Sequence, residues 1–473
     1  MHHVSRTSLT FPLFAVDLAR RTSRRIHGTS SNAIEKHVKT QRLTNVTAEA
    51  KYSKSGRPEL VASKPERGGT PSAGRHHESS KPSTLAVHML LQRQSDMDKT
   101  FRTSRIIASC ARKREEVIGR ISSVLRKRFG SDYEVVPFGS TVYMRGFDVV
   151  HRSFQKHGTG GSQNLPKGDL DLVVLDKNRP LGFSPDVNAK KLPVIYNMWK
   201  LAAALSRAGF TNVQPVPFAS VPIVKFHDPQ TRLSLDINVN NRLGLMNSNF
   251  LGSYCDVLPG LRTLLVAIKL WARPLGLNTP SGGSMVTFST YALTLMTLGW
   301  LQSRGLAPNL QDGVETETSS EVGTFWIFRS MQAKGSRIPC DVRFREVTSM
   351  DRYPPLPLND TLSNWFRFWG YTFDFEQQAL DIKEGPIRSR HDLVLLDPKL
   401  SEHQACVIDP FFRLKNVTNS VGSAALKKFR SECQRASDEI RIKNLSMEQI
   451  IDDYELLDRL QEPNVDLHRP RRS

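Results

Sequence analysis

Through the middle of the chain, short apolar runs alternate with longer segments in which apolar residues recur at helical spacing. Four short runs have the length and the β-branched content of strands: residues 133–138, 169–175, 216–226 and 233–239. Two longer segments, residues 98–129 and 194–208, have the pattern of amphipathic helices, and from residue 258 onward the pattern is mainly helical. Strands with flanking helices, followed by helices alone, predict an α+β fold with a second, mostly helical domain.

The helical part combines two strongly apolar helices, over residues 261–272 and 289–302, with a segment dense in aromatic side chains at 362–375. A packed core is the main interpretation of this density, and a surface that stacks on nucleic-acid bases is the alternative. Residues 305–360 are rich in Pro, Ser and Thr and predict loops. Short strands are expected near residues 394–396 and 406–408, and helices over 423–442 and 446–461 close the chain.

These elements divide the chain into four parts. We expect a disordered basic arm over 1–88, a sheet domain over 130–240, a helical domain built from 95–129 and 241–440, and a C-terminal helix with a basic tail over 441–473. Within the sheet domain, the Gly-containing stretch 146–167 predicts a surface loop.

The charge of the chain favours a polyanionic partner. Its 473 residues carry a formal net charge of +20, with a sequence pI near 9.9, and the simplest such partner is a nucleic acid. Roughly half of the positive surplus lies in residues 1–88, so the remainder of the chain is basic in its own right.

The composition of the chain does not decide its cellular compartment. The N-terminal residues are rich in Ser and Arg, which fits either a mitochondrial transit peptide or an ordinary disordered arm, so mitochondrion, cytoplasm and nucleus stay open. The five cysteines lie far apart and predict neither a zinc site nor a disulfide framework, which favours a reducing intracellular compartment. The longest apolar run, near residues 293–301, is too short to span a bilayer, and we expect no membrane partner.

Three carboxylates dominate the candidate chemistry. Asp169 and Asp171 are two positions apart in a predicted strand, so both project from one face. Asp236 lies on the polar face of the strand over 233–239. Neighbouring carboxylates repel each other, and a hard divalent cation with oxygen ligands is the usual way to hold them together. The sequence therefore predicts a divalent-metal site on the sheet.

The other candidate residues are weaker indications of a binding site when each is taken alone. Gly139 and Ser140 turn a predicted strand into a helix, a geometry that presents backbone N–H groups and a hydroxyl to a triphosphate. Lys269 and Tyr291 are lone polar residues in apolar helices, where the usual role is a core position whose polar tip reaches water.

Eight motifs follow one another between about residues 98 and 430: 138–140, 169–171, 219–226, 235–237 with 240–241, 268–272, 291–296, 368–374, and 408–411 with 416–417. In this order they resemble the motifs of the noncanonical poly(A)/poly(U) RNA polymerases, or terminal nucleotidyltransferases, of the DNA polymerase β-like nucleotidyltransferase superfamily. The resemblance implies a nucleotidyltransferase palm over 130–240, a PAP-associated segment at about 360–420 in the helical domain, and a nucleoside triphosphate between the domains.

The resemblance also implies catalytic roles. Asp169, Asp171 and Asp236 would bind two Mg²⁺ ions, or Mn²⁺, that promote in-line attack of an RNA 3′-hydroxyl on the α-phosphate with pyrophosphate leaving. The implied nucleotide-binding roles are triphosphate anchoring by Gly139 and Ser140, ribose contact by Asn247, phosphate contact by Lys269, base stacking by Tyr291, and supporting positions at Arg273 and Thr290. Arg273 stands where relatives often have a second lysine, and it supplies a forked cation there.

Two departures from the family pattern bear on function. The loop over 146–167 is longer than in relatives, and it either lines the RNA path or is plain surface. Lys415 stands where uridylyltransferases of this family often place a histidine, which favours ATP over UTP. We therefore expect a poly(A) RNA polymerase that acts in RNA 3′-end processing.

Three alternatives stay open: terminal uridylyl transfer, an inactive RNA-binding adaptor, and a small-molecule nucleotidyltransferase. The sequence contains no recognisable RNA-recognition motif or zinc finger. RNA capture would then depend on the basic arm, the basic body or a protein partner.

Overall fold

The computed structural model describes residues 110–144, 170–280, 285–314, 323–328, 337–348, 351–394, 397–400 and 402–443, all within a unit that spans Arg93–Ser473. The predicted arm over 1–88, the loop over 146–167, the helix over 446–461 and residue Asp169 lie outside the described residues.

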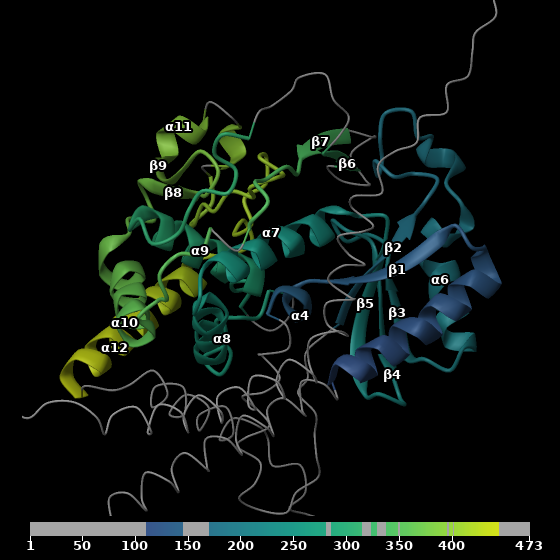
Figure 1. Cartoon of the computed structure of the whole chain (residues 1–473), viewed down its shortest axis with the longest axis horizontal. Coiled ribbons are helices and arrows are strands. Elements are labelled where there is room, and N and C mark those ends of the chain that lie inside the picture. The colour runs from purple at the N-terminus through teal and green to yellow at the C-terminus, as the bar shows by residue number, and fades with distance from the viewer. Residues whose placement is uncertain are drawn as a thin grey trace, which may run out of the picture. The chain divides into compact units, whose positions relative to one another are not determined.

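A five-stranded sheet forms one side of the described fold (Figure 1). Its strands lie in the order β1-β2-β5-β4-β3, where β1 is Tyr133–Phe138, β2 is Leu170–Asp176, β3 is Thr211–Val216, β4 is Ile223–Asp228 and β5 is Leu233–Val239. Only β2 and β5 run parallel, and the other neighbouring pairs are antiparallel. This mixed sheet, with helices beside it, confirms the predicted α+β class.

One face of the sheet is closed by two helices. Apolar residues of β2, β4 and β5 are buried with Leu201 and Leu205 of α6 (Met198–Arg207) and with Val117 and Ile121 of the helix over 110–129. The sequence predicts that residues 95–129 belong to the helical domain. Their described part instead joins the core of the sheet, because its apolar stripe fits the face opposite the carboxylates.

The prediction of one strand over 216–226 was wrong. The chain forms a β-hairpin there: β3 ends at Val216, residues 217–222 turn, and β4 begins at Ile223. Pro217 and Pro222 explain the break, since proline has no backbone N–H to donate to a sheet ladder. β3 itself was not predicted, because its sequence is mostly polar and half-exposed.

The helical side contains α7 (Leu243–Val257), α8 (Leu261–Ala272), α9 (Thr290–Ser303), α10 (Leu358–Arg367), a π-helical turn at Phe368–Thr372 and α12 (Ser423–Lys443) (Figure 1). Trp365, Phe366 and Trp369 are completely buried. Trp365 and Phe366 pack edge-on against Trp271 of α8, and Trp365 also packs against Phe429 of α12 and against Trp369. The interpretation of residues 362–375 as a core is thereby confirmed, with Tyr371 as an exposed exception.

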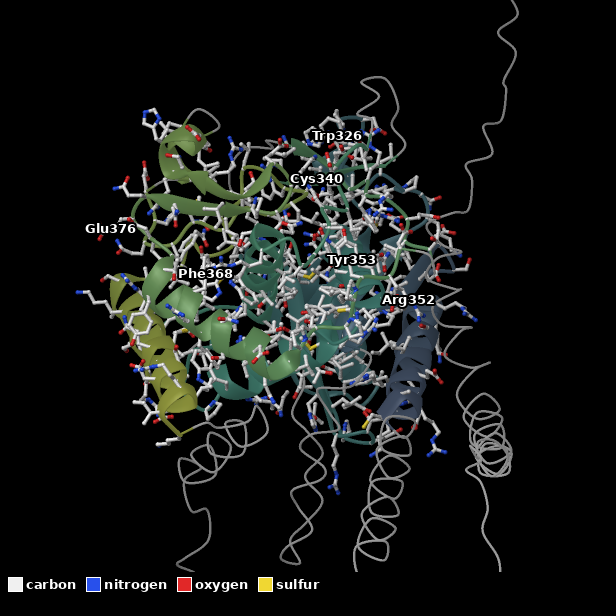
Figure 2. All side chains as sticks on the ribbon, turned by 60° about the vertical axis from the view of Figure 1, so that its left-hand side comes forward. Trp326, Cys340, Arg352, Tyr353, Phe368 and Glu376 are labelled. Atoms are coloured by element: carbon white, nitrogen blue, oxygen red, sulfur yellow. The ribbon has the colours of Figure 1, made fainter. Side chains whose placement is uncertain are left out.

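Two short ribbons were missed by the sequence patterns. One is β6 (Thr324–Phe328) with β7 (Arg337–Asp341), and the other is β8 (Gln378–Asp381) with β9 (Gly385–Ser389). Trp326 and Cys340, labelled in Figure 2, mark the two strands of the first ribbon. Trp326 bridges to Gly182 in the loop after β2, and Arg337 donates to the carbonyl oxygens of Ser184 and Val187, so this ribbon holds to the sheet domain.

The remaining elements are short. They are α4 (Ser140–Tyr143), α11 (Arg390–Val394) and the 3₁₀ turns Ala189–Lys191, Val194–Tyr196 and Pro398–Leu400. The strand expected at 394–396 was wrong at Val394, which ends a helix. No helix in the described ranges is by itself long and apolar enough to cross a membrane; α7 and α8 meet that test only as a pair, and they are bent by 118°.

Candidate active site

Two of the three predicted catalytic carboxylates lie side by side. Because β2 and β5 are parallel and in register, Asp171 is the direct partner of Asp236. Both belong to the face of the sheet opposite the core that holds Leu170, Leu172 and Leu235. The third, Asp169, directly precedes β2 but is outside the described residues, so its placement stays a prediction.

A lysine extends this row across the sheet. Lys225 of β4 is in register with Asp236, and its Nζ lies 2.6 Å from Asp236 Oδ2. Adjacent carboxylates need positive charge between or beside them, and here an ammonium group supplies part of it. Lys225 was not among the predicted site residues.

Gly139 allows the turn after β1 to approach the carboxylates. Its backbone has φ 80° and ψ −163°, which side-chain-bearing residues avoid. A Cβ at this position would lie 2.5 Å from Asp171 Oδ2. Glycine is therefore required both by the backbone and by the nearness of Asp171, and Ser140 follows as the first residue of α4.

Helix α7 is tied to the same turn. The Gly139 N–H donates to Ser248 Oγ at 2.7 Å, and Ser248 in turn donates to the Gly244 carbonyl. Asn247, the predicted ribose contact, directly precedes Ser248. Its Oδ1 is buried and finds no hydrogen-bond partner among the described residues, so a buried acceptor is left over at this position of α7.

Tyr291 and Lys415 are brought to one place by Asp409. Tyr291 donates its hydroxyl to Asp409 Oδ2 at 3.3 Å, and Asp409 Oδ1 accepts from the backbone N–H groups of Phe411 and Phe412. The Asp409 N–H donates to the carbonyl of Lys415, whose side chain is exposed. Burial, together with the Asp409 carboxylate, raises the pKa of Tyr291 well above its ordinary value, so the phenol stays a donor.

The remaining predicted residues lie on α8 and α9. Lys269 and the half-buried Arg273 are one turn apart at the end of α8, and the Arg273 N–H donates to the Lys269 carbonyl. Thr290 Oγ1 donates to Asn278 Oδ1 at 3.2 Å, which ties the start of α9 to the segment after Arg273. Tyr143 of α4 shares a hydrogen bond with Thr294 of α9, 3.3 Å between oxygens, and so links this region to the Gly139 turn.

The side chains present suit a divalent cation and a phosphate ester. Asp171 and Asp236 offer hard oxygen ligands on one face, the Lys225 ammonium group lies at Asp236, and the missing Cβ of Gly139 lets the turn after β1 lie close to Asp171. In the described ranges no group of three or more His, Cys, Asp or Glu residues could by itself hold a metal ion, and Asp169 is not part of those ranges.

Three contributors escaped the sequence analysis. Lys225 could have been placed by strand alternation had the hairpin been recognised. Ser248 had no local signal, and Asp409 was part of the motif over 408–411 but was given no role, since the partners of the two residues lie 109 and 118 residues away in the chain.

The chain is similar to proteins named poly(A) RNA polymerases. The family model described as "Poly(A) RNA polymerase, mitochondrial-like, central palm domain" matches residues 160–256. Poly(A) RNA polymerase cid13 of Schizosaccharomyces pombe is 28% identical over 248 residues, which are 50% of this chain and 39% of that protein. Poly(A) RNA polymerase GLD2 of Xenopus tropicalis is 28% identical over 290 residues, 61% of this chain and 49% of that protein. The chain thus matches about half, or less, of the length of these relatives.

Solved structures share the fold. A crystal structure of a mutant Cid1 poly(U) polymerase bound to MgATP superposes with a TM-score of 0.51 at 22% identity, covering 73% of this chain and 92% of that one. A structure of Cid1 with its short product ApU gives a TM-score of 0.50 at 22% identity, covering 73% and 91%. At this identity the likeness supports the fold alone.

Proposed function

We propose that this chain, which belongs to the noncanonical poly(A)/poly(U) RNA polymerase family of nucleotidyltransferases, is an enzyme that adds nucleotides to RNA 3′ ends without a template. The observation that carries the proposal is the register of Asp171 with Asp236 beside the glycine turn. Related proteins named poly(A) RNA polymerases support the same activity. Residues 130–240 would be the palm, and the helical side would complete the nucleotide site.

The carboxylates have the first role in this proposal. Asp171 and Asp236, with Asp169, would hold Mg²⁺, which when bound neutralises charge at the α-phosphate and favours ionisation of the RNA 3′-hydroxyl. Lys225 would orient the Asp236 carboxylate along the sheet through their 2.6 Å ion pair. Gly139 lets the turn lie close to Asp171, and its N–H is already bonded to Ser248, which leaves triphosphate anchoring to Ser140.

The helical side would position the nucleotide. Asn247 Oδ1 is an acceptor suited to a ribose hydroxyl, and Lys269 and Arg273 would neutralise phosphate oxygens. Tyr291 would stack on the base, with Asp409 fixing the orientation of its ring through the hydroxyl, and Thr290 would hold the start of α9 in place.

Pyrophosphate release distinguishes nucleotide addition to RNA ends from the alternative functions. The purified chain with Mg²⁺ and ATP is expected to release pyrophosphate only when RNA with a free 3′-hydroxyl is present. RNA that ends in a 3′-deoxynucleotide is the matched control and should give no release, because the attacking hydroxyl is missing. Release without RNA would favour a small-molecule nucleotidyltransferase, and no release under any condition would favour an RNA-binding adaptor.

ATP is the proposed substrate. Lys415 is joined through Asp409 to Tyr291, so its side chain starts close to the proposed base site and lacks the imidazole expected for uridylyl transfer. The alternative is UTP, which the sequence left open. Each nucleotide offered separately should give extension mainly with ATP, and Lys415→His should shift the ATP-to-UTP ratio of rates toward UTP. A wild-type preference for UTP would contradict the assignment of the base.

A further inference from the structure

Exposed apolar side chains gather at one end of the sheet domain. Seven large apolar residues are exposed in the described part of the chain, and three of them are Val194, Trp199 and Phe218, with exposed fractions of 56%, 62% and 79%. Single exposed apolar residues are ordinary on a protein surface, but a gathering that includes two aromatic rings calls for a partner.

The fold explains why these residues lie together. Val194 opens the 3₁₀ turn that leads directly into α6, and Trp199 is in the first turn of that helix. After α6 the chain reverses, and β3 packs against the helix. α6 and β3 have similar lengths of roughly 15–20 Å, so Phe218, just beyond the end of β3, returns to the level of Trp199.

The same end is positively charged. Lys190, Lys191 and Lys200 are exposed, and between residues 185 and 200 the sequence has one acidic residue, Asp186. A second copy of this chain docked symmetrically here would bring lysines against lysines, which disfavours self-association. Lysines interleaved with exposed aromatic rings are the chemistry that binds single-stranded nucleic acid, with phosphates on the ammonium groups and bases on the rings.

We propose that this surface, defined by Lys190, Lys191, Val194, Trp199, Lys200 and Phe218 and called the α6 surface below, binds single-stranded RNA upstream of its 3′ end. The inference rests on the proposed function for the identity of the RNA as substrate. α6 covers the face of the sheet opposite Asp171 and Asp236, so one RNA must pass around the domain to reach both places. Only RNA longer than the catalytic site can use the α6 surface.

Equilibrium binding of labelled RNA tests the proposal without catalysis. Fluorescence anisotropy is measured for the full chain without nucleotide, using an RNA of about 30 nucleotides and one of about 5, which is too short to reach both places. Trp199→Ala is expected to raise the Kd for the long RNA roughly tenfold, as loss of one stacked base does. Lys190→Glu with Lys191→Glu should also weaken binding, and it should reduce the slope of log Kd against log salt by about 1.4 or more.

The controls separate this surface from charge in general. Lys427→Glu with Arg430→Glu makes the same charge change at two exposed positions of α12. In this double variant, Trp199→Ala is expected to raise the Kd for the long RNA by the same factor as in the wild type. All variants should bind the short RNA as the wild type does. The replaced residues are exposed, and unchanged thermal unfolding would show that each variant folds.

The outcomes are distinct from those for the proposed function. Wild-type affinity of Trp199→Ala and of the double lysine variant for long RNA would overturn the inference, even if the enzyme extends RNA. Loss of self-association in Trp199→Ala, measured by light scattering, with RNA binding intact would assign the surface to a second copy instead. Long-RNA binding that depends on the α6 surface would uphold the inference even if the wild type failed to extend RNA, a result that would count against the proposed function alone.

Discussion

Gly139→Ala is the substitution that most sharply probes the proposed active site. Gly139 has φ 80° and ψ −163°, a conformation populated almost only by glycine. The new Cβ would lie 2.5 Å from Asp171 Oδ2, whereas ordinary contacts begin near 3.4 Å. The carboxylate therefore has to move by about 1 Å or the turn has to shift by as much.

Gly139→Ala is expected to lower both the folding stability and the reaction rate, and the effect on the rate is the larger. Backbone strain of this kind costs about 1–3 kcal/mol of folding free energy. A misplacement of about 1 Å in a catalytic group lowers a rate roughly 100-fold, because charge stabilisation in the transition state depends on geometry. We expect the loss of activity to exceed what partial unfolding explains, since a folded majority would still have a displaced Asp171.

Gly130→Ala is a matched control. Gly130 also has positive φ, 104°, but a Cβ there meets no atom within 4 Å. It should lose a similar amount of stability in chemical denaturation and keep nearly full activity in a primer-extension assay. Extension by Gly139→Ala at a rate close to that of Gly130→Ala would refute the reasoning that Asp171, held next to this turn, takes part in the chemistry.

Three further substitutions give distinct outcomes. Asp236→Asn keeps the shape but removes the charge, and extension should fall by at least about 100-fold with thermal unfolding unchanged; comparable activity would remove Asp236 from the site. Tyr291→Phe keeps the ring but leaves Asp409 without one donor, so steady-state kinetics should show a raised KM for the nucleotide with kcat nearly retained; an unchanged KM would contradict the positioning role. Burial opposes ionisation of Asp381, but the ion pair with Arg413 outweighs burial and lowers the pKa of Asp381. The charged carboxylate therefore stabilises the folded protein at pH values above the unfolded pKa, and this stabilisation is lost as pH falls through the lower pKa of the folded state. Asp381→Asn should therefore cost about 3–5 kcal/mol near pH 7 and less in acid, as followed by urea unfolding; equal losses at both pH values would exclude the linkage.

Strand periodicity predicted which faces hold Asp171 and Asp236 but not that the two residues are partners. Alternation put Asp171 and Asp236 on polar faces of their strands, and the structure adds that the two strands are parallel neighbours in register. Pairing between strands that are more than fifty residues apart has no signature in a local pattern, so this part could only come from the fold.

The Lys225–Asp236 pair shows how one misassigned element hides a functional residue. The sequence predicted one strand over 216–226 and gave Lys225 no role, whereas the structure pairs β4 with β5 and brings Lys225 opposite Asp236. Two prolines in that stretch were the available signal, and they were outweighed by its apolar content.

Contacts between segments that are distant in the chain could not be predicted from the sequence for a different reason. Ser248 is an ordinary polar residue on a helix until the Gly139 turn lies against it, and Asp409 is buried by residues from several distant segments. Tertiary packing decides such roles, and local composition does not encode them.

Extension of end-labelled oligo(A) RNA tests the central claim most directly. The purified chain is incubated with Mg²⁺ and ATP beside an Asp171→Asn variant whose thermal unfolding and RNA binding match the wild type. The account predicts a ladder of longer products from the wild type and none from the variant. Failure of the wild type to extend RNA with any of the four nucleotides, or equal extension by the variant, would contradict it.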